Sequence, residues 1–288
     1  MKVARSPAEL EPRPRGVAIG TFDGVHLGHR RVVEEVLQAG RPATVVTFEP
    51  HPRIALGNRV ELLSTLERRL ELLAELGAEE TLVLEFTLEL ARLEPAEFAE
   101  RVLRAIGAKL VVAGADFRFG RGRSGDLDLL RELGFEVRAV PLLDGVSSSA
   151  IRRALQEGEV AEAARMLGRP PELDGIVVAG DSRGGTLGFP TANLRLEPDL
   201  IVPEYGIYAG AALGRRAAVS IGTNPHYGGE ERRIEAYLLD FEGDLYGSRV
   251  VVELWRRLRD ERAFASEDEL VEQISRDVEA TRSAERPV

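Results

Sequence analysis

The 288-residue chain contains no cysteine, which excludes disulfides, zinc–thiolate sites and thiol catalysis. Lys2 and Lys109 are its only lysines, and no G-x-x-x-x-G-K-[ST] string occurs, so a P-loop is excluded as well. No apolar run approaches the ~20 residues that span a bilayer, and the first 15 residues lack the apolar segment of a secretory signal. We therefore expect a cytoplasmic protein with no membrane partner.

Positive charge is also scarce, since the net charge is −10. Nucleic-acid binding needs a basic surface, so this balance argues against a nucleic-acid partner. The content of 44% hydrophobic and 30% charged residues is typical of a globular protein, and the length suits two domains. Whether the protein is a homo-oligomer stays open.

In the first half, strand-like apolar runs alternate with helical patterns. The runs are residues 17–19, 44–48, 81–84, 110–113 and 136–140. Between them, leucines from Leu62 to Leu73 recur at helical spacing, and a second helical pattern starts at Pro95 and ends at Gly107. Such alternation predicts an α/β fold with a doubly wound parallel sheet, which binds ligands beyond the carboxyl ends of its strands.

The pattern changes after a helical stretch over residues 148–167, which closes the first half. The turn-rich segment 168–171 then predicts a boundary between domains at 1–168 and 172–288. Beyond it, five apolar runs are separated by glycine-rich turns, at residues 176–179, 207–212, 217–221, 234–239 and 250–254. These predict a small antiparallel β-barrel, followed by a terminal helix with a capping box at residues 266–269.

The segment 20–29, GTFDGVHLGH, joins an apolar strand to a helical pattern. The first turn of a helix presents unpaired backbone N–H groups and a positive dipole end, which bind phosphate. Here Gly20 and Gly28 would let the backbone approach a ligand, and His26 and His29 would add donors. A single histidine at such a place is often only a cap or a packed polar residue, but the whole string predicts nucleotide binding.

This string resembles the H-x-G-H signature of the nucleotidyltransferase superfamily. The resemblance implies that His26 and His29 hold ATP phosphates and stabilise charge at the α-phosphate, with Phe22 and Asp23 beside them. Later in the chain, residues 147–152 read SSSAIR. Serines there cap a helix and also form a phosphate cradle, in which we expect three residues to take part, namely Ser148, Ser149 and Arg152.

Two further segments of the first half follow strand ends. Residues 47–52, TFEPHP, form either a rigid turn or part of the site. Residues 114–126 contain a G-x-G-x-x-G, but these glycines lie several residues beyond the strand end, so a dinucleotide-binding fingerprint is rejected. Arginines at 118, 121 and 123 instead suggest a loop over bound phosphates.

The second half resembles riboflavin kinases in its segment 180–193, a glycine-rich flap that leads into Pro-Thr-Ala-Asn. Segments 221–225, 233–238 and 240–247 match that family in order and spacing. Thr191 and Asn193 offer oxygen ligands suited to Mg²⁺, and Glu235 is the expected base for the 5′-hydroxyl of riboflavin. Backbone contacts to ATP are expected from the flap, at Gly184, Gly185, Thr186 and Gly188.

Together the two halves resemble the bacterial bifunctional riboflavin kinase/FAD synthetases. The resemblance implies ATP-dependent phosphorylation of riboflavin to FMN by the second domain and adenylylation of FMN to FAD, with release of pyrophosphate, by the first. Flavin binding is then expected at Phe48, Pro50, His51, Asp116 and Phe117.

The chain departs from the family pattern at three positions, Thr21, Ser149 and Gly185. Since Gly185 removes a charge near phosphate, one alternative is an FMN adenylyltransferase with an inactive kinase domain. A flavin-binding regulator without turnover is another, against which the complete motifs count.

Overall fold

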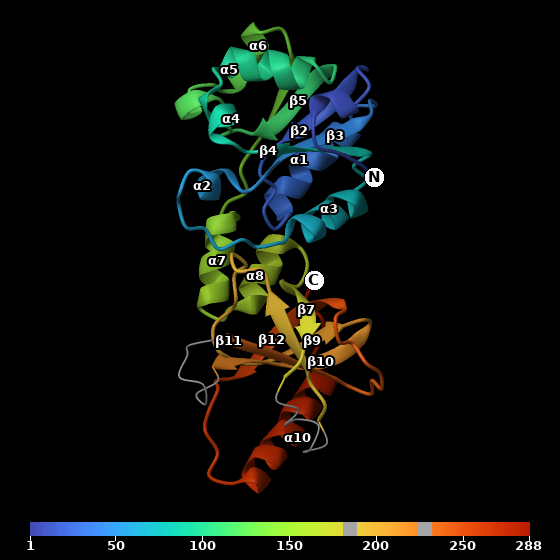
Figure 1. Ribbon diagram of the computed structural model, residues 1–288, viewed down its shortest axis with the longest axis vertical. Helices are drawn as coiled ribbons and strands as arrows, with labels where there is room; N and C mark the ends of the chain where they lie inside the picture. Colours follow the sequence, from blue (N-terminus) through green and yellow to red (C-terminus); the bar gives the residue numbers. More distant parts are fainter. Residues whose placement is uncertain (181–188, 224–231) are drawn as a thin grey trace. The chain divides into compact units, whose positions relative to one another are not determined.

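A computed structural model describes residues 1–180, 189–223 and 232–288 of the chain (Figure 1). Contacts divide the chain into two compact units. Unit 1 comprises Met1–Glu61 and Leu66–Ser147, and unit 2 comprises Leu62–Thr65 and Ser148–Val288. The helical stretch 148–167 thus groups with unit 2, whereas the sequence places it in the first domain, before the predicted boundary at residues 168–171. The predicted boundary between the functional domains stays a prediction. Within the described ranges, no helix is both long and apolar enough to cross a membrane.

Unit 1 is built on a six-stranded parallel sheet in the order β1-β4-β3-β2-β5-β6. Its strands are β1 Lys2–Ala4, β2 Arg15–Ile19, β3 Ala43–Glu49, β4 Glu80–Glu85, β5 Ala108–Gly114 and β6 Glu136–Val140. From β2 the chain builds one side of the sheet through β3 and β4, and the other through β5 and β6. The direction of winding therefore reverses beside β2, where open α/β sheets place their ligands.

Helices connect these strands, and their bounds are η1 Pro7–Glu9, α1 Leu27–Leu37, α2 Pro52–Ala55, α3 Leu66–Glu75, α4 Leu88–Arg92, α5 Pro95–Phe98, η2 Ala99–Arg104, η3 Arg121–Arg123 and α6 Leu127–Glu132. The segment η2 is π-helical and continues α5 directly. Pro95 opens α5, as the sequence predicts, because proline at a first-turn position sacrifices no helical hydrogen bond.

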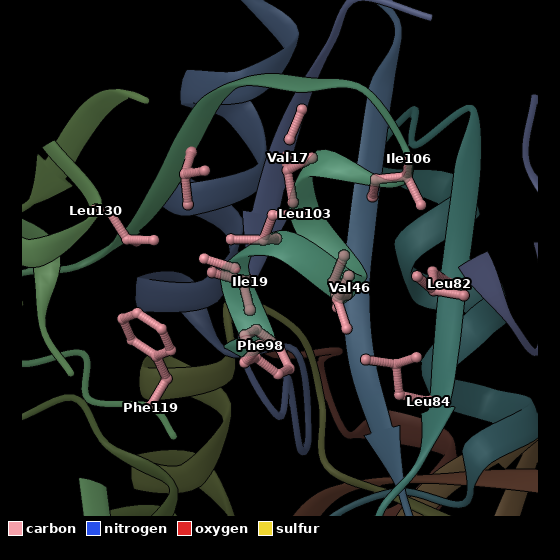
Figure 2. Packing of buried hydrophobic residues seen from close by; sticks show 14 of the residues in the cluster. Val17, Ile19, Val46, Leu82, Leu84, Phe98, Leu103, Ile106, Phe119 and Leu130 are labelled. Atoms are coloured by element: carbon pink, nitrogen blue, oxygen red, sulfur yellow. The ribbon is translucent and has the colours of Figure 1, made fainter. Parts of the chain in front are cut away.

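Successive residues of the strands face two separate cores. Figure 2 shows Val17 and Ile19 of β2 with Val46 of β3 on the face that packs against α5 and η2. Ala18, between Val17 and Ile19, and Val45, next to Val46, belong to the second core on the other face, with α1 and α3. Because both faces are buried, the four inner strands β2 to β5 are largely apolar runs, and the predicted doubly wound sheet is confirmed.

Unit 2 contains a closed antiparallel barrel with the strand order β10-β11-β8-β7-β12-β9. The strands are β7 Glu172–Val178, β8 Ala192–Leu196, β9 Gly206–Ala212, β10 Arg215–Thr223, β11 Arg232–Leu238 and β12 Arg249–Arg259. Buried residues such as Leu194, Tyr208 and Ile234 fill its interior. The predicted barrel is therefore confirmed, although the sequence does not reveal β8.

Among the residues that the structure describes, three helices accompany the barrel: α7 Ser148–Gln156, α8 Val160–Leu167 and α10 Glu267–Ser283. The single predicted helix over 148–167 is thus two, because the chain turns between them at Gly158, whose φ is 76°. At the start of α10, the Ser266 side chain accepts a hydrogen bond from the backbone N–H of Glu269 at 3.2 Å. The Glu269 carboxylate reaches back in turn and accepts from the backbone N–H of Ala265, the residue before the N-cap, at 3.1 Å, so the capping box is present with its reciprocal bond shifted by one residue.

Candidate active sites

The histidine turn of unit 1 follows β2 directly and leads into α1. The backbone reaches this helix through residues with positive φ, at Phe22 (51°), Gly24 (77°) and Val25 (41°). The apolar side chains of Phe22 and Val25 are buried in the core that lines α1, which holds this unusual backbone in place. A core packed under the turn thus fixes where the helix N-terminus points.

His26 is the N-cap of α1, and its Nδ1 accepts a hydrogen bond from the backbone N–H of His29 at 3.3 Å. An Nδ1 that accepts carries no proton, so a neutral His26 keeps its proton on Nε2, which is then a donor. The two imidazole rings stack with centroids 3.6 Å apart and an interplanar angle of 17°. His26 is 8% exposed and His29 is half-buried.

Gly28 and Gly20 make this packing feasible. A Cβ on Gly28 would lie 3.1 Å from the His26 ring, and one on Gly20 would lie 3.3 Å from the Phe22 ring. Both distances are too short for ordinary side-chain contact, so glycine allows the rings to lie against the backbone. Asp23, also predicted for this site, is fully buried in the turn.

The segment after β3, the neighbour of β2, carries three of the predicted flavin residues. Phe48 is 9% exposed and lies in the core, where its ring meets that of Phe86 edge-on at 5.6 Å. Pro50 is exposed. His51 is 8% exposed, and its Nδ1 accepts a hydrogen bond from the backbone N–H of Arg53 at 3.2 Å, which caps α2.

Arg69 of α3 holds the end of β3 and is a residue that sequence reasoning missed. Its side chain is fully buried, and its Nη1 donates to the carbonyl oxygen of Phe48 at 3.1 Å. Its Nη2 lies 3.5 Å from the Glu49 carboxylate. An arginine on a helix 20 residues downstream gives no sequence signal, since only the fold brings it beneath this loop.

The segment after β5, on the other side of β2, carries the remaining flavin candidates. Asp116 is exposed, and Phe117 is half-buried with its ring stacked on Phe119 at 5.7 Å. Arg118 pairs with Asp126 at 2.6 Å and Arg121 with Glu94 at 2.6 Å, so two of the three arginines expected over phosphate are held in ion pairs.

The carboxyl ends of β3, β2 and β5 therefore bring three predicted segments to one edge of the sheet. Ser148, Ser149 and Arg152 lie in the first turns of α7, which belongs to unit 2. Ser148 is half-buried and Ser149 is exposed. Their joint action with the histidines stays a prediction.

In unit 2, the barrel brings together Thr191, Asn193 and Glu235. Asn193 of β8 and Glu235 of β11 are directly paired across the two strands. The Thr191 hydroxyl donates to Glu235 Oε2 at 3.3 Å. Because their neighbours Leu194 and Ile234 fill the interior, these polar side chains lie on the outer face of the barrel.

Arg233 joins this cluster, and sequence reasoning missed it too. Its Nε lies 2.7 Å from Glu235 Oε1 and donates to Asn193 Oδ1 at 3.1 Å. The one available signal was its spacing, since residues two apart on a strand share a face. Nearby, the rings of Phe189 and Tyr237 meet edge-on at 5.5 Å. Four of the predicted phosphate-binding residues, Gly184, Gly185, Thr186 and Gly188, lie outside the described residues.

Comparisons with known proteins match the two halves of the chain to two different families. Two family models match, FAD synthetase over residues 9–151 and riboflavin kinase over residues 167–284. A bifunctional riboflavin kinase/FMN adenylyltransferase from Listeria monocytogenes is 37% identical, over 93% of this chain and 91% of the relative. Another protein of that description, from Escherichia coli, is 37% identical over 96% of each chain.

Among solved structures, a crystal structure from Streptococcus pneumoniae, where the protein is named a macrolide-efflux protein, matches with a TM-score of 0.88 and 34% identity. The match covers 98% of this chain and 99% of that one. Its name differs from those of the curated relatives, whereas both family models agree with the curated relatives.

Proposed function

The chain belongs to the bifunctional riboflavin kinase/FMN adenylyltransferase family, and from this premise we propose that the histidine turn of unit 1 is its adenylylation site and the outer face of the barrel its kinase site. The enzyme phosphorylates riboflavin to FMN and adenylylates FMN to FAD, with ATP as the second substrate of both steps. Since both family models match, the reading as an adenylyltransferase without kinase activity is not supported.

The observation that carries the kinase assignment is that Asn193 and Glu235 are paired on adjacent strands and that Thr191, just before β8, donates to Glu235. In the proposed reaction the riboflavin 5′-hydroxyl oxygen bonds to the γ-phosphorus, and the bond from that phosphorus to the β,γ-bridging oxygen breaks. ADP leaves, and the hydroxyl proton passes to the Glu235 carboxylate. Such a base contributes about 10²–10⁴-fold to the rate.

Magnesium is part of this proposal. The Thr191 hydroxyl and the Asn193 amide offer the hard oxygen ligands that Mg²⁺ prefers. Gly180 supports the fit, since a Cβ there would collide with the Asn193 amide. When bound, the ion would neutralise charge on the phosphates of ATP. Backbone contacts of Gly184, Gly185, Thr186 and Gly188 with those phosphates belong to the same proposal.

In the adenylylation site, a phosphate oxygen of FMN bonds to the α-phosphorus of ATP, and pyrophosphate leaves. We assign His26 and His29 to the charge that develops at the α-phosphate, because Nε2 of His26 is a donor and the helix N-terminus adds its own N–H groups. Gly20, Phe22, Asp23 and Gly28 shape that turn. Ser148, Ser149 and Arg152 at the start of α7 are proposed to bind ATP through its phosphates.

Flavin binding in unit 1 is assigned to the segments that flank the turn. Pro50 and Asp116 are exposed for such contact, while Phe48 would support the site from the core. His51 and Phe117 complete the proposed set. A cytoplasmic location and the absence of a nucleic-acid partner stay predictions of the sequence, which leaves the oligomeric state open.

The test uses two variants of the intact protein with riboflavin, ATP and Mg²⁺, and follows flavins by chromatography. His29→Ala is expected to stop the conversion at FMN. Glu235→Gln is expected to block FMN formation but to leave added FMN convertible to FAD. The exposed Glu242→Gln serves as a matched control that should alter neither step. If either of the first two variants impaired both steps equally, the two-site assignment would be wrong.

A further inference from the structure

Arg233 is the one cation among the described residues that contacts both Glu235 and Asn193. The Arg233 side chain is 28% exposed and that of Glu235 is 25% exposed, so a ligand on the outer face of the barrel could reach both. Two partly buried side chains of opposite charge thus form a neutral pair beside the proposed metal ligands.

Within the proposed kinase site, Glu235 must lie within hydrogen-bond distance of the riboflavin hydroxyl. The hydroxyl oxygen must in turn lie about 3–3.5 Å from the γ-phosphorus before it attacks. The guanidinium of Arg233 lies 2.7 Å from Glu235, so it is within a side chain's reach of the transferred phosphoryl group.

The charge balance favours such a contact. The transition state of phosphoryl transfer spreads negative charge over the equatorial oxygens of the moving group. Arginine suits this charge because its planar guanidinium always carries its proton and matches phosphate oxygens in a bidentate manner. Once the Glu235 carboxylate takes up the hydroxyl proton, the pair with Arg233 loses its attraction, and the guanidinium is left beside the phosphoryl oxygens.

We propose that Arg233 is a catalytic residue of the kinase site that binds the γ-phosphoryl group of ATP and neutralises its charge during transfer to riboflavin. In the free enzyme Arg233 orients Glu235 and Asn193; in the reaction it exchanges its contact with Glu235 for one with the phosphoryl oxygens. This inference rests on the proposed assignment of Glu235 to the kinase site.

The experiment compares Arg233→Gln and Arg233→Lys with the wild type. Arg256→Gln is the matched control, because Arg256 is an exposed arginine on β12, three strands away from β11 in either direction around the barrel. Three quantities are measured on the intact protein: kcat for FMN formation, the affinity for a non-hydrolysable ATP analogue with Mg²⁺ by calorimetry, and the rate of FMN adenylylation. Fluorescence of Trp255, the only tryptophan, reports whether the barrel is folded.

For Arg233→Gln we expect kcat for FMN formation to fall by about 10²–10³-fold, as when a preorganised donor to a transition state is removed. Affinity for the analogue is expected to fall several-fold, because a γ-phosphoryl contact is lost. Arg233→Lys should recover part of both, while FMN adenylylation and Arg256→Gln stay at wild-type levels.

Unchanged kcat in a folded Arg233→Gln protein would overturn the proposal. Unchanged or tighter binding of the analogue would overturn it too, since Arg233 would then act only through Glu235 and Asn193. Glu235→Gln separates this inference from its premise. That variant should bind the analogue normally and make no FMN; if it made FMN, the kinase site itself would be misassigned.

Discussion

Replacing Arg69 by methionine tests whether a buried arginine beneath β3 holds the flavin-proposed segment of unit 1 in place. The variant keeps much of the side-chain volume but removes the donor that the carbonyl oxygen of Phe48 accepts at 3.1 Å. Arg68, its neighbour on α3, provides the matched control. The variant Arg68→Met removes the same charge, but the ion-pair partners of Arg68 lie near the surface: Glu71 at 2.9 Å and Glu75 at 3.1 Å from its guanidinium.

The expected cost follows from these contacts. A hydrogen bond to a charged donor contributes about 1.5–3 kcal/mol, and the orphaned carbonyl of Phe48 stays buried. The ion pair with Glu49 adds little, because it spans 3.5 Å and Glu49 is 32% exposed. Within the described part of the chain, Nε and Nη2 of Arg69 have no hydrogen-bond partner, so removing the buried charge also recovers part of its desolvation cost.

We therefore expect Arg69→Met to destabilise the end of β3 by about 2 kcal/mol, against at most about 1 kcal/mol for Arg68→Met. Amide hydrogen exchange measures this directly, since about 2 kcal/mol corresponds to roughly 30-fold faster exchange. The loss of protection should appear in β3 and β4 and leave the barrel strands unchanged. Equal effects of the two variants would refute the anchoring role of Arg69.

Two further predictions concern unit 2. Asp240 receives two hydrogen bonds from the Arg282 guanidinium, at 2.8 and 2.9 Å, which lower the pKa of this carboxyl below its ordinary 3.8. A carboxyl whose pKa is lowered in the folded state stabilises the fold at pH values above its unfolded-state pKa, and this stabilisation is lost as pH falls through the folded-state pKa. Asp240→Asn should therefore be less stable than the wild type at pH 7 and approach it below pH 3.8, as measured by denaturant titration. In Gly180→Ala the new Cβ would displace the Asn193 amide, so FMN formation should need more Mg²⁺ while FMN adenylylation stays normal; an unchanged Mg²⁺ requirement would contradict the role given to Asn193.

The sequence predicts the fold where burial leaves a clear pattern. The strands β2 to β5 are found as apolar runs because both faces of the sheet are covered there, whereas the edge strand β6 is largely exposed and is found from its short run of residues 136–140. The strand β8, in contrast, has the polar Asn193 and Arg195 on one side, and β1 is a short edge strand of three residues. Neither has an apolar run of its own, and pairing with neighbouring strands is what defines them.

The candidate sites, too, are predictable where they depend on local sequence and not where they depend on tertiary contacts. The histidine turn is predictable because strand end, turn and helix start are contiguous, so ten residues contain the whole arrangement. Phe48 was predicted for the flavin and lies in the core cluster, since an apolar residue at a strand end fits either role in sequence. Arg69 and Arg233 escape prediction because their partners are identified only by tertiary contacts.

The kinase site depends on strand register in a way that the adenylylation site does not. Thr191 and Glu235 are 44 residues apart, and they meet because Ile234 pairs with Leu194 in the barrel interior. Ile234 and Ala236 are 4% and 1% exposed, so they fix β11 with its alternate residues outward. A slip of one residue would turn Glu235 into the apolar interior, where an unpaired carboxylate is strongly disfavoured. The apolar residues between the polar ones therefore select the register in which Arg233, Glu235 and Asn193 share the outer face.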